Sequence, residues 1–185
     1  MNKKIIISFL LTIFSNGCMY YSLAGSIPVH INSIAIPIVE NQTAEFGMSE
    51  SVTENLLNKF NEENILRVTD EDQANSILRG TITRVTDSPY TFTKEEAVTE
   101  YRFTVHMKVE WYDVRDDKVL MEKSFSGWGA YGLSGDISTD GIDNDGDGLL
   151  DGEDNDEFGD PREFATSVAV IKIAEDVLNE IMTSW

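Results

Sequence analysis

The chain has 185 residues, of which 41% are hydrophobic, and its formal net charge at pH 7 is −19. This length suits one domain with its own core, and the hydrophobic content indicates a globular chain. So negative a charge argues strongly against a nucleic-acid partner. Residues 136–160 alone carry −11, with nine Asp, two Glu and no Lys or Arg, so the remainder is only mildly acidic.

The first 18 residues have the pattern of a bacterial lipoprotein signal. Lys3 and Lys4 precede an apolar run from Ile5 to Phe14, which is too short to cross a hydrocarbon core of about 30 Å as a helix. A small residue and then Cys18 follow at the expected cleavage point. We therefore expect residues 1–17 to be a signal peptide and Cys18 to become acylated. The alternative is an ordinary signal peptide followed by a free cysteine.

The lipid anchor predicts a location. Several acyl chains on one N-terminus hold a protein firmly on a membrane. Met19 follows the cysteine in place of the Asp that signals inner-membrane retention in well-studied bacteria. We expect the outer membrane, with residues 18–185 forming a single domain in the periplasm.

The first half of this domain predicts a strand and then a helix. Ser33–Val39 is a β-branched run typical of a strand, in which Pro37 indicates an edge or a strand end. Ser49 and Ser51 are candidate helix caps. An apolar face recurs every four residues to about residue 64; its members are Val52, Leu56 and Phe60.

Three or four further strands and a second helix are expected, and the first of these strands is a brief one at residues 65–68. Ser76–Asp87 alternates, and Glu100–Val114 alternates strictly, which predicts a sheet with one buried and one wet face and antiparallel neighbours. The turn 115–118 leads to a strand at 119–131. In the last helix Asp160 is the predicted N-cap, and the predicted apolar stripe comprises Phe164, Val168, Ile171, Leu178 and Ile181.

The fold class that follows is α+β. We expect two layers, with a mostly antiparallel or mixed sheet of about four strands and two amphipathic helices that bury their apolar stripes on one face.

The order of motifs resembles the LptE-like lipopolysaccharide-assembly lipoproteins. The resemblance rests on six segments, listed in chain order. They are a Tyr-x-Leu-x-Gly tether at 21–25, GSIPVHINSIAIPIVENQTAEFG at 25–47, ENLLNKF at 54–60, ILRGTITRV at 77–85, EYRFTVHMKVEW at 100–111 and the C-terminal helix. It covers most of residues 18–135 and 160–185 and leaves the acidic segment 136–160 as an insertion.

The resemblance implies a non-enzymatic partner of a large outer-membrane β-barrel, which together with that barrel places lipopolysaccharide in the outer leaflet. No lipid-contacting residue transfers from the family by alignment, so the lipopolysaccharide-binding residues are unknown at this stage. Four basic residues on predicted strands are candidates for contacts with phosphates or are simply solvated; they are Arg79, Arg84, Arg102 and Lys108.

The insertion has the spacing of a calcium loop. Carboxylates separated by one residue converge around a tight turn, and calcium takes six to eight oxygen ligands. The predicted ligands are Asp143, Asp145, Asp147, the carbonyl of Leu149, Asp151 and Asp154, with Gly148 at the turn. We expect weak, structural binding, with a dissociation constant on the order of 10⁻⁴ to 10⁻³ M. The alternatives are a solvated acidic run and a calcium bridge to lipopolysaccharide phosphates.

Catalysis is not expected. The one cysteine is expected to be acylated, His30 and His106 lie far apart in the sequence, and the chain has no phosphate loop or nucleophile elbow. The rival to the assembly function is a calcium-dependent, lipidated adhesion or binding module at the surface or in the periplasm.

Overall fold

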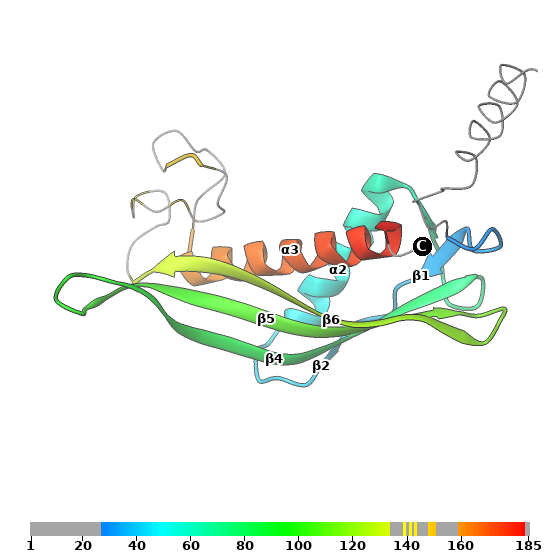
Figure 1. Cartoon of the computed structure of the whole chain (residues 1–185), viewed down its shortest axis with the longest axis horizontal. Helices are drawn as coiled ribbons and strands as arrows, with labels where there is room; N and C mark the ends of the chain where they lie inside the picture. Colours follow the sequence, from blue (N-terminus) through cyan, green and yellow to red (C-terminus); the bar gives the residue numbers. More distant parts are fainter. Residues whose placement is uncertain are drawn as a thin grey trace, which may run out of the picture.

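A computed structural model describes residues 27–133, 139, 141, 143, 148–150 and 159–183. Cys18 and the predicted signal peptide lie outside these residues. The described part is a mixed α+β fold with a six-stranded sheet and two helices (Figure 1). The elements are β1 (Ser33–Ala35), β2 (Glu40–Asn41), α2 (Met48–Glu63), β3 (Arg67–Val68), β4 (Ser76–Phe92), β5 (Val98–Asp113), β6 (Lys118–Gly132) and α3 (Pro161–Thr183).

The sheet is larger than the expected four strands. Its order is β3-β1-β4-β5-β6, with β2 also paired to β4. β1 is parallel to β3 and β4, and β2 is parallel to β4, whereas β4, β5 and β6 form an antiparallel meander. The strand predicted at 33–39 forms only over Ser33–Ala35, because Pro37 has no N–H to donate and the N–H of Val39 is donated to Thr53 Oγ1 (2.9 Å).

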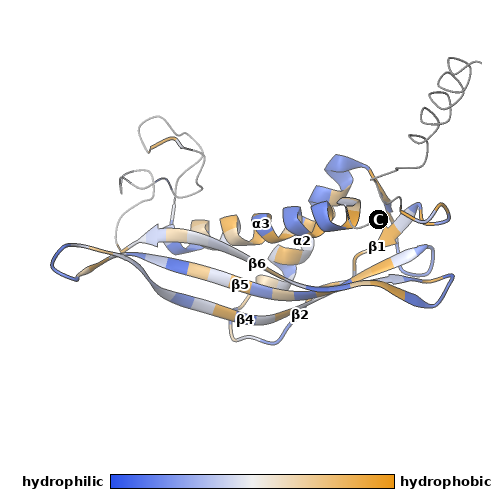
Figure 2. Ribbon diagram, viewed as in Figure 1, coloured by the Kyte–Doolittle hydropathy of each residue, from blue (hydrophilic) through white to orange (hydrophobic). Residues whose placement is uncertain are grey.

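Buried side chains of both helices share one core with the sheet, and Figure 1 shows α3 running along β6. α3 packs along β6 and β5, and α2 packs against α3 and β3. Hydrophobic and hydrophilic residues alternate along α3, as expected for a helix with one buried face (Figure 2).

The alternation predicted for β5 is confirmed. The residues that face the helices are at most 1% exposed; they are Phe103, Val105, Met107, Val109 and Trp111. They share one core with Val52, Leu56 and Phe60 of α2. The intervening β5 side chains lie on the opposite face, which we call the open face.

The start of α2 differs from the prediction. Neither Ser49 nor Ser51 caps the helix, which begins at Met48, and no side chain makes a capping bond. The residue before it, Gly47, turns the chain with a φ of 76°, a conformation that glycine adopts at no steric cost. The Met48 side chain is then buried at the first position of the helix.

α3 confirms its predicted cap but not all of its predicted stripe. Asp160 Oδ1 accepts hydrogen bonds from the backbone N–H groups of Arg162 (3.1 Å) and Glu163 (3.0 Å). Ile171, which was expected to be buried, is 40% exposed. Small residues that the predicted stripe omitted, Ala165 and Ala169, are wholly buried against the sheet instead.

Candidate functional site: cations on the open face

The open face of the sheet presents the basic residues that the sequence singled out. Strand alternation places Arg102, His106 and Lys108 of β5 there, between side chains of β4 and β6. The antiparallel register sets Arg84 opposite His106 and Arg79 opposite Glu110. The charges on this face separate into two groups.

At one end of the face the cations are neutralised. Arg79 Nη1 lies 3.1 Å from Glu110 Oε1, and Lys108 forms an ion pair with Glu122. The hydrogen bond to Glu122, followed by the charge of that carboxylate, raises the pKa of Lys108. Exposed pairs of this kind contribute little to stability, and their charge is already balanced. We therefore assign Arg79 and Lys108 to ordinary surface chemistry.

At the other end Arg102 has no carboxylate partner among the described residues. Its guanidinium carbon lies 3.9 Å from the centre of the Tyr90 ring and 4.3 Å from the centre of the Trp128 ring. Its Nε is buried and makes no hydrogen bond. The two rings are 5.8 Å apart, centre to centre, and are 41% and 38% exposed. An arginine stacked on aromatic rings keeps its fork of N–H donors for an anion.

Two more cations border this group. Lys172 of α3 places Nζ 5.1 Å from the centre of the Trp128 ring. Arg84 Nη2 donates to His106 Nε2 at 3.4 Å. Burial, and then the charge of Arg84, lower the pKa of His106, so the imidazole is a neutral acceptor at pH 7. No ion pair is recorded for Arg84 in the part of the chain that the structure describes.

We call Arg84, Arg102, Lys172, Tyr90 and Trp128 the cation–aromatic cluster. Arg84 pairs with His106 of β5, which is four residues from Arg102. The backbones of the two arginines are therefore about 13 Å apart along the strands, at ~3.3 Å per residue. Guanidinium groups bind phosphates and carboxylates through paired N–H donors. The cluster is therefore a surface suited to an anionic ligand with more than one charged group. Sequence alternation placed Arg102 on the wet face of its strand, whereas Arg84 reaches that face through the register shift between Ile82 and Arg84. The lack of a carboxylate partner at Arg102 depends on contacts that no local pattern contains.

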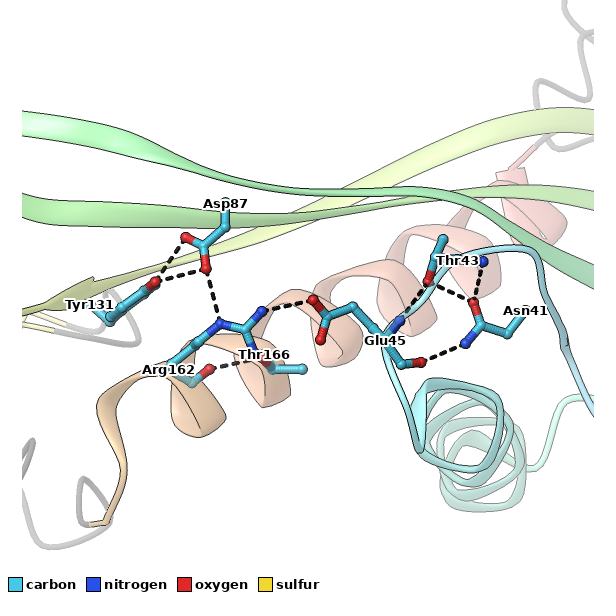
Figure 3. Close-up of polar contacts among 7 residues, drawn as sticks. All are labelled: Asn41, Thr43, Glu45, Asp87, Tyr131, Arg162 and Thr166. Atoms are coloured by element: carbon cyan, nitrogen blue, oxygen red, sulfur yellow. Dashed lines mark hydrogen bonds and ion pairs between the residues drawn. The ribbon is translucent and has the colours of Figure 1, made fainter.

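A second polar network lies on the helix side of the sheet, at the start of α3 (Figure 3). Arg162 Nε donates to Asp87 Oδ2 on β4 and its Nη2 donates to Glu45 Oε1 before α2, both at 2.9 Å. The hydroxyl of Tyr131 also donates to Asp87 (2.8 Å). Burial, followed by that hydrogen bond, raises the pKa of Tyr131 to about 12. This network joins β4, β6, α3 and the loop before α2, and two carboxylates balance the charge of Arg162, so its role is structural.

A third group combines a histidine with two aspartates. His30 Nε2 lies 2.7 Å from Asp113 Oδ2 and 4.0 Å from Asp116 Oδ2, and within the described residues these are the side chains close enough to share a metal ion. Asp113 Oδ1 already accepts the N–H groups of Arg115 (2.9 Å) and Asp116 (3.2 Å). Burial favours protonation of Asp113, but the hydrogen bonds outweigh it and lower its pKa. Because its acceptors are occupied, this group acts as a clamp between residue 30 and the β5–β6 turn.

Only two of the predicted calcium ligands are described. Asp143 Oδ2 accepts a hydrogen bond from the N–H of Gly148 at 3.0 Å, and Gly148 has a φ of 96°. Leu149 follows and is 40% exposed. The other predicted ligands lie outside the described residues; they are Asp145, Asp147, Asp151 and Asp154.

Among the described residues, no helix combines the length and the apolar character that crossing a membrane requires.

Solved structures share the fold at low identity. Protein XCC0632 from Xanthomonas campestris matches with a TM-score of 0.53 and 7% identity, over 81% of this chain and 83% of that chain. The hypothetical protein CT253 from Chlamydia trachomatis gives 0.51 and 10%, over 82% and 98%. Rare lipoprotein B from Shewanella oneidensis gives 0.45 and 13%, over 81% and 95%. At such identities the first two matches show the fold alone.

The class that the structure defines is an α+β domain with a mixed six-stranded sheet and two helices. A family match gives a narrower assignment than this class. The LptE family, described as lipopolysaccharide-assembly, matches residues 31–183, so this chain belongs to that family. No curated protein sequence matches it.

Proposed function

We propose that this protein is a non-enzymatic lipoprotein of the outer membrane that acts in lipopolysaccharide assembly. The observation that carries the proposal is the family match, which spans nearly the whole described domain. Acylated Cys18 would anchor the chain, with the body in the periplasm and a β-barrel of the assembly machinery as its partner. The family match favours this function over a calcium-dependent adhesion module.

We assign the contact with lipopolysaccharide to the cation–aromatic cluster. Lipopolysaccharide carries phosphates, whereas this chain carries a net charge of −19, so long-range repulsion opposes their encounter. A local set of unpaired cations offsets that repulsion where the two touch. Arg102 supports the assignment best, because its guanidinium is stacked on two aromatic rings and has no carboxylate partner among the described residues.

The partner is tested by co-purification. A C-terminally tagged copy is extracted from native membranes in mild detergent and captured with and without a calcium chelator. The proposal expects a large β-barrel protein under both conditions. Extraction of the chain alone, or loss of its partner with the chelator, contradicts it and supports the adhesion module.

We further propose that the acidic insertion binds calcium weakly and that the ion stabilises this segment without creating the fold. The support is the bond from the turn glycine, Gly148, to Asp143, because it holds the first predicted ligand over the turn. Asp143→Asn should weaken calcium binding in a titration of the full chain, relative to wild type. Failure of the calcium-free protein to unfold cooperatively would contradict the stabilising role.

A further inference from the structure

Phe46 is an aromatic side chain in contact with little but water. It is 101% exposed, whereas Met48, two residues later, is 3% exposed and belongs to the core. A single exposed apolar residue on a mobile loop would need no explanation. The loop that carries Phe46, residues 42–47, is instead held by hydrogen bonds on both sides of this residue.

The first part of this loop folds around Asn41. Its Oδ1 accepts hydrogen bonds from the backbone N–H (2.9 Å) and the hydroxyl (2.8 Å) of Thr43, and its Nδ2 donates to the carbonyl of Glu45 (2.7 Å). The N–H of Glu45 donates to Thr43 Oγ1 at 3.3 Å. These contacts, shown in Figure 3, fix the backbone that enters Phe46.

The far side of the loop is fixed to the rest of the domain. The carboxylate of Glu45 binds Arg162, which in turn binds Asp87 on β4. After Phe46, the carbonyl of Gly47 accepts the N–H of Ser51 and starts α2. The residues on both sides of Phe46 are therefore immobilised, and the ring is presented on a preformed support. Binding through such a residue loses little conformational entropy.

The charge around Phe46 limits what it can bind. Residues 40–54 contain four Glu and no Lys or Arg, and of these four only Glu45 has a cation partner among the described residues, Arg162. An anionic membrane surface or lipopolysaccharide would be repelled by this segment, and membrane-binding surfaces pair their apolar residues with Lys or Arg. A protein pocket with an apolar floor and a basic rim matches both the ring and the surrounding carboxylates.

We propose that Phe46 is a docking anchor that inserts into an apolar, basic-rimmed pocket of a protein partner. This surface shares no residue with the cation–aromatic cluster, to which we assign an anionic ligand. The proposal holds for any protein partner, so it does not depend on the partner being a β-barrel.

The first test replaces Phe46 with the photoreactive residue p-benzoylphenylalanine in the full, membrane-anchored chain. The matched control carries the same residue at Val29, which is 98% exposed and lies outside the loop. After illumination of intact cells, mass spectrometry identifies the adducts. We expect a defined protein adduct from position 46 and none from position 29. Adducts only with lipid or lipopolysaccharide, only with a second copy of this chain, or none at all would overturn the proposal.

The second test measures binding of that protein by purified full-length variants. Phe46→Ser should weaken binding by about tenfold or more, as expected for an aromatic anchor, and Phe46→Leu should retain most of it. Val29→Ser should bind like wild type. Thermal unfolding of Phe46→Ser should be unchanged, because the ring contacts no core. Equal binding by Phe46→Ser and wild type would overturn the proposal, while leaving a role in lipopolysaccharide assembly untouched.

Discussion

Gly127 of β6 lies directly against the backbone of Ala169 in α3. A Cβ placed on Gly127 would stand 1.9 Å from the carbonyl oxygen of Ala169, and one on Gly129 would stand 2.3 Å from that of Ala165. Two glycines on the strand thus meet two alanines one turn apart on the helix. This close approach sets the distance between α3 and the sheet, and with it the position of the Lys172 ammonium beside Trp128.

Gly127→Ala should therefore destabilise the fold. The added methyl group forces the helix away from the sheet, and overpacking of this kind costs about 1–3 kcal/mol. Urea unfolding should show a lower midpoint with an unchanged slope. Ser126→Ala, on the exposed side of the same strand, is the control and should stay within about 0.5 kcal/mol of wild type. Equal midpoints for the two variants would contradict the close packing of α3.

Arg162→Ala should destabilise the domain and loosen the loop that presents Phe46. It leaves Asp87 and Glu45 without their cation, and hydrogen bonds to charged groups contribute about 1.5–3 kcal/mol when shielded. Partial exposure of both carboxylates reduces the expected loss to about 1–2 kcal/mol. Hydrogen exchange should rise at residues 42–47. Arg115→Ala removes only an exposed contact of 3.7 Å, so an equal loss in that control would contradict the bridging role of Arg162.

Because of the clamp at Asp113, the free energy of unfolding should decrease at acidic pH. Its pKa in the folded protein is lowered from 3.8, so the unfolded chain binds the proton first as pH falls. The stabilisation is complete above pH 3.8 and is lost as pH falls through the lower, folded-state pKa. Asp113→Asn should be less stable than wild type at pH 7, and the difference should narrow in acid. A difference that stays constant from pH 6 to pH 2 would contradict ionised Asp113 as the stabilising form.

His106 should contribute a separate loss of stability near pH 6. Burial, and then Arg84, lower its pKa below 6.5 in the folded state. Between that lower value and 6.5 the unfolded chain takes up the proton and the folded chain does not, so stability falls as pH drops below 6.5. His106→Gln should flatten this part of the profile, measured by urea unfolding at several pH values. If the free energy of unfolding of the variant fell with pH as steeply as that of wild type, His106 would be ruled out as the source of this pH dependence.

Sequence patterns predicted the elements whose signals are local. The alternation of β5 placed Phe103 and Trp111 in the core, and Asp160 was recognised as a cap because its partners are the next residues in the chain. The expected sheet was too small because a strand of two residues, such as β2, is too short to show a period. β3 lies within the brief strand that was expected at 65–68.

The errors concern contacts between distant residues. Ile171 fits a helical period, but the buried face of α3 is set by where Gly127 and Gly129 allow close approach. A Gly-x-Gly strand and an Ala-x-x-x-Ala helix are the signal from which this packing was predictable. Arg162 binds residues 75 and 117 positions away, and the unpaired guanidinium of Arg102 depends on three strands at once. Neither has a signature in a short window of sequence.

The most direct test of the account is lipopolysaccharide binding by two arginine variants of the full-length protein in detergent. Arg102→Gln removes the unpaired guanidinium, and Arg79→Gln removes one that is already paired with Glu110 on the same face. Titration with labelled lipopolysaccharide should show affinity about tenfold or more lower for Arg102→Gln, since a charge-assisted contact is lost, and near wild type for Arg79→Gln. Equal affinities for the two variants would contradict the cation–aromatic cluster as the lipopolysaccharide site.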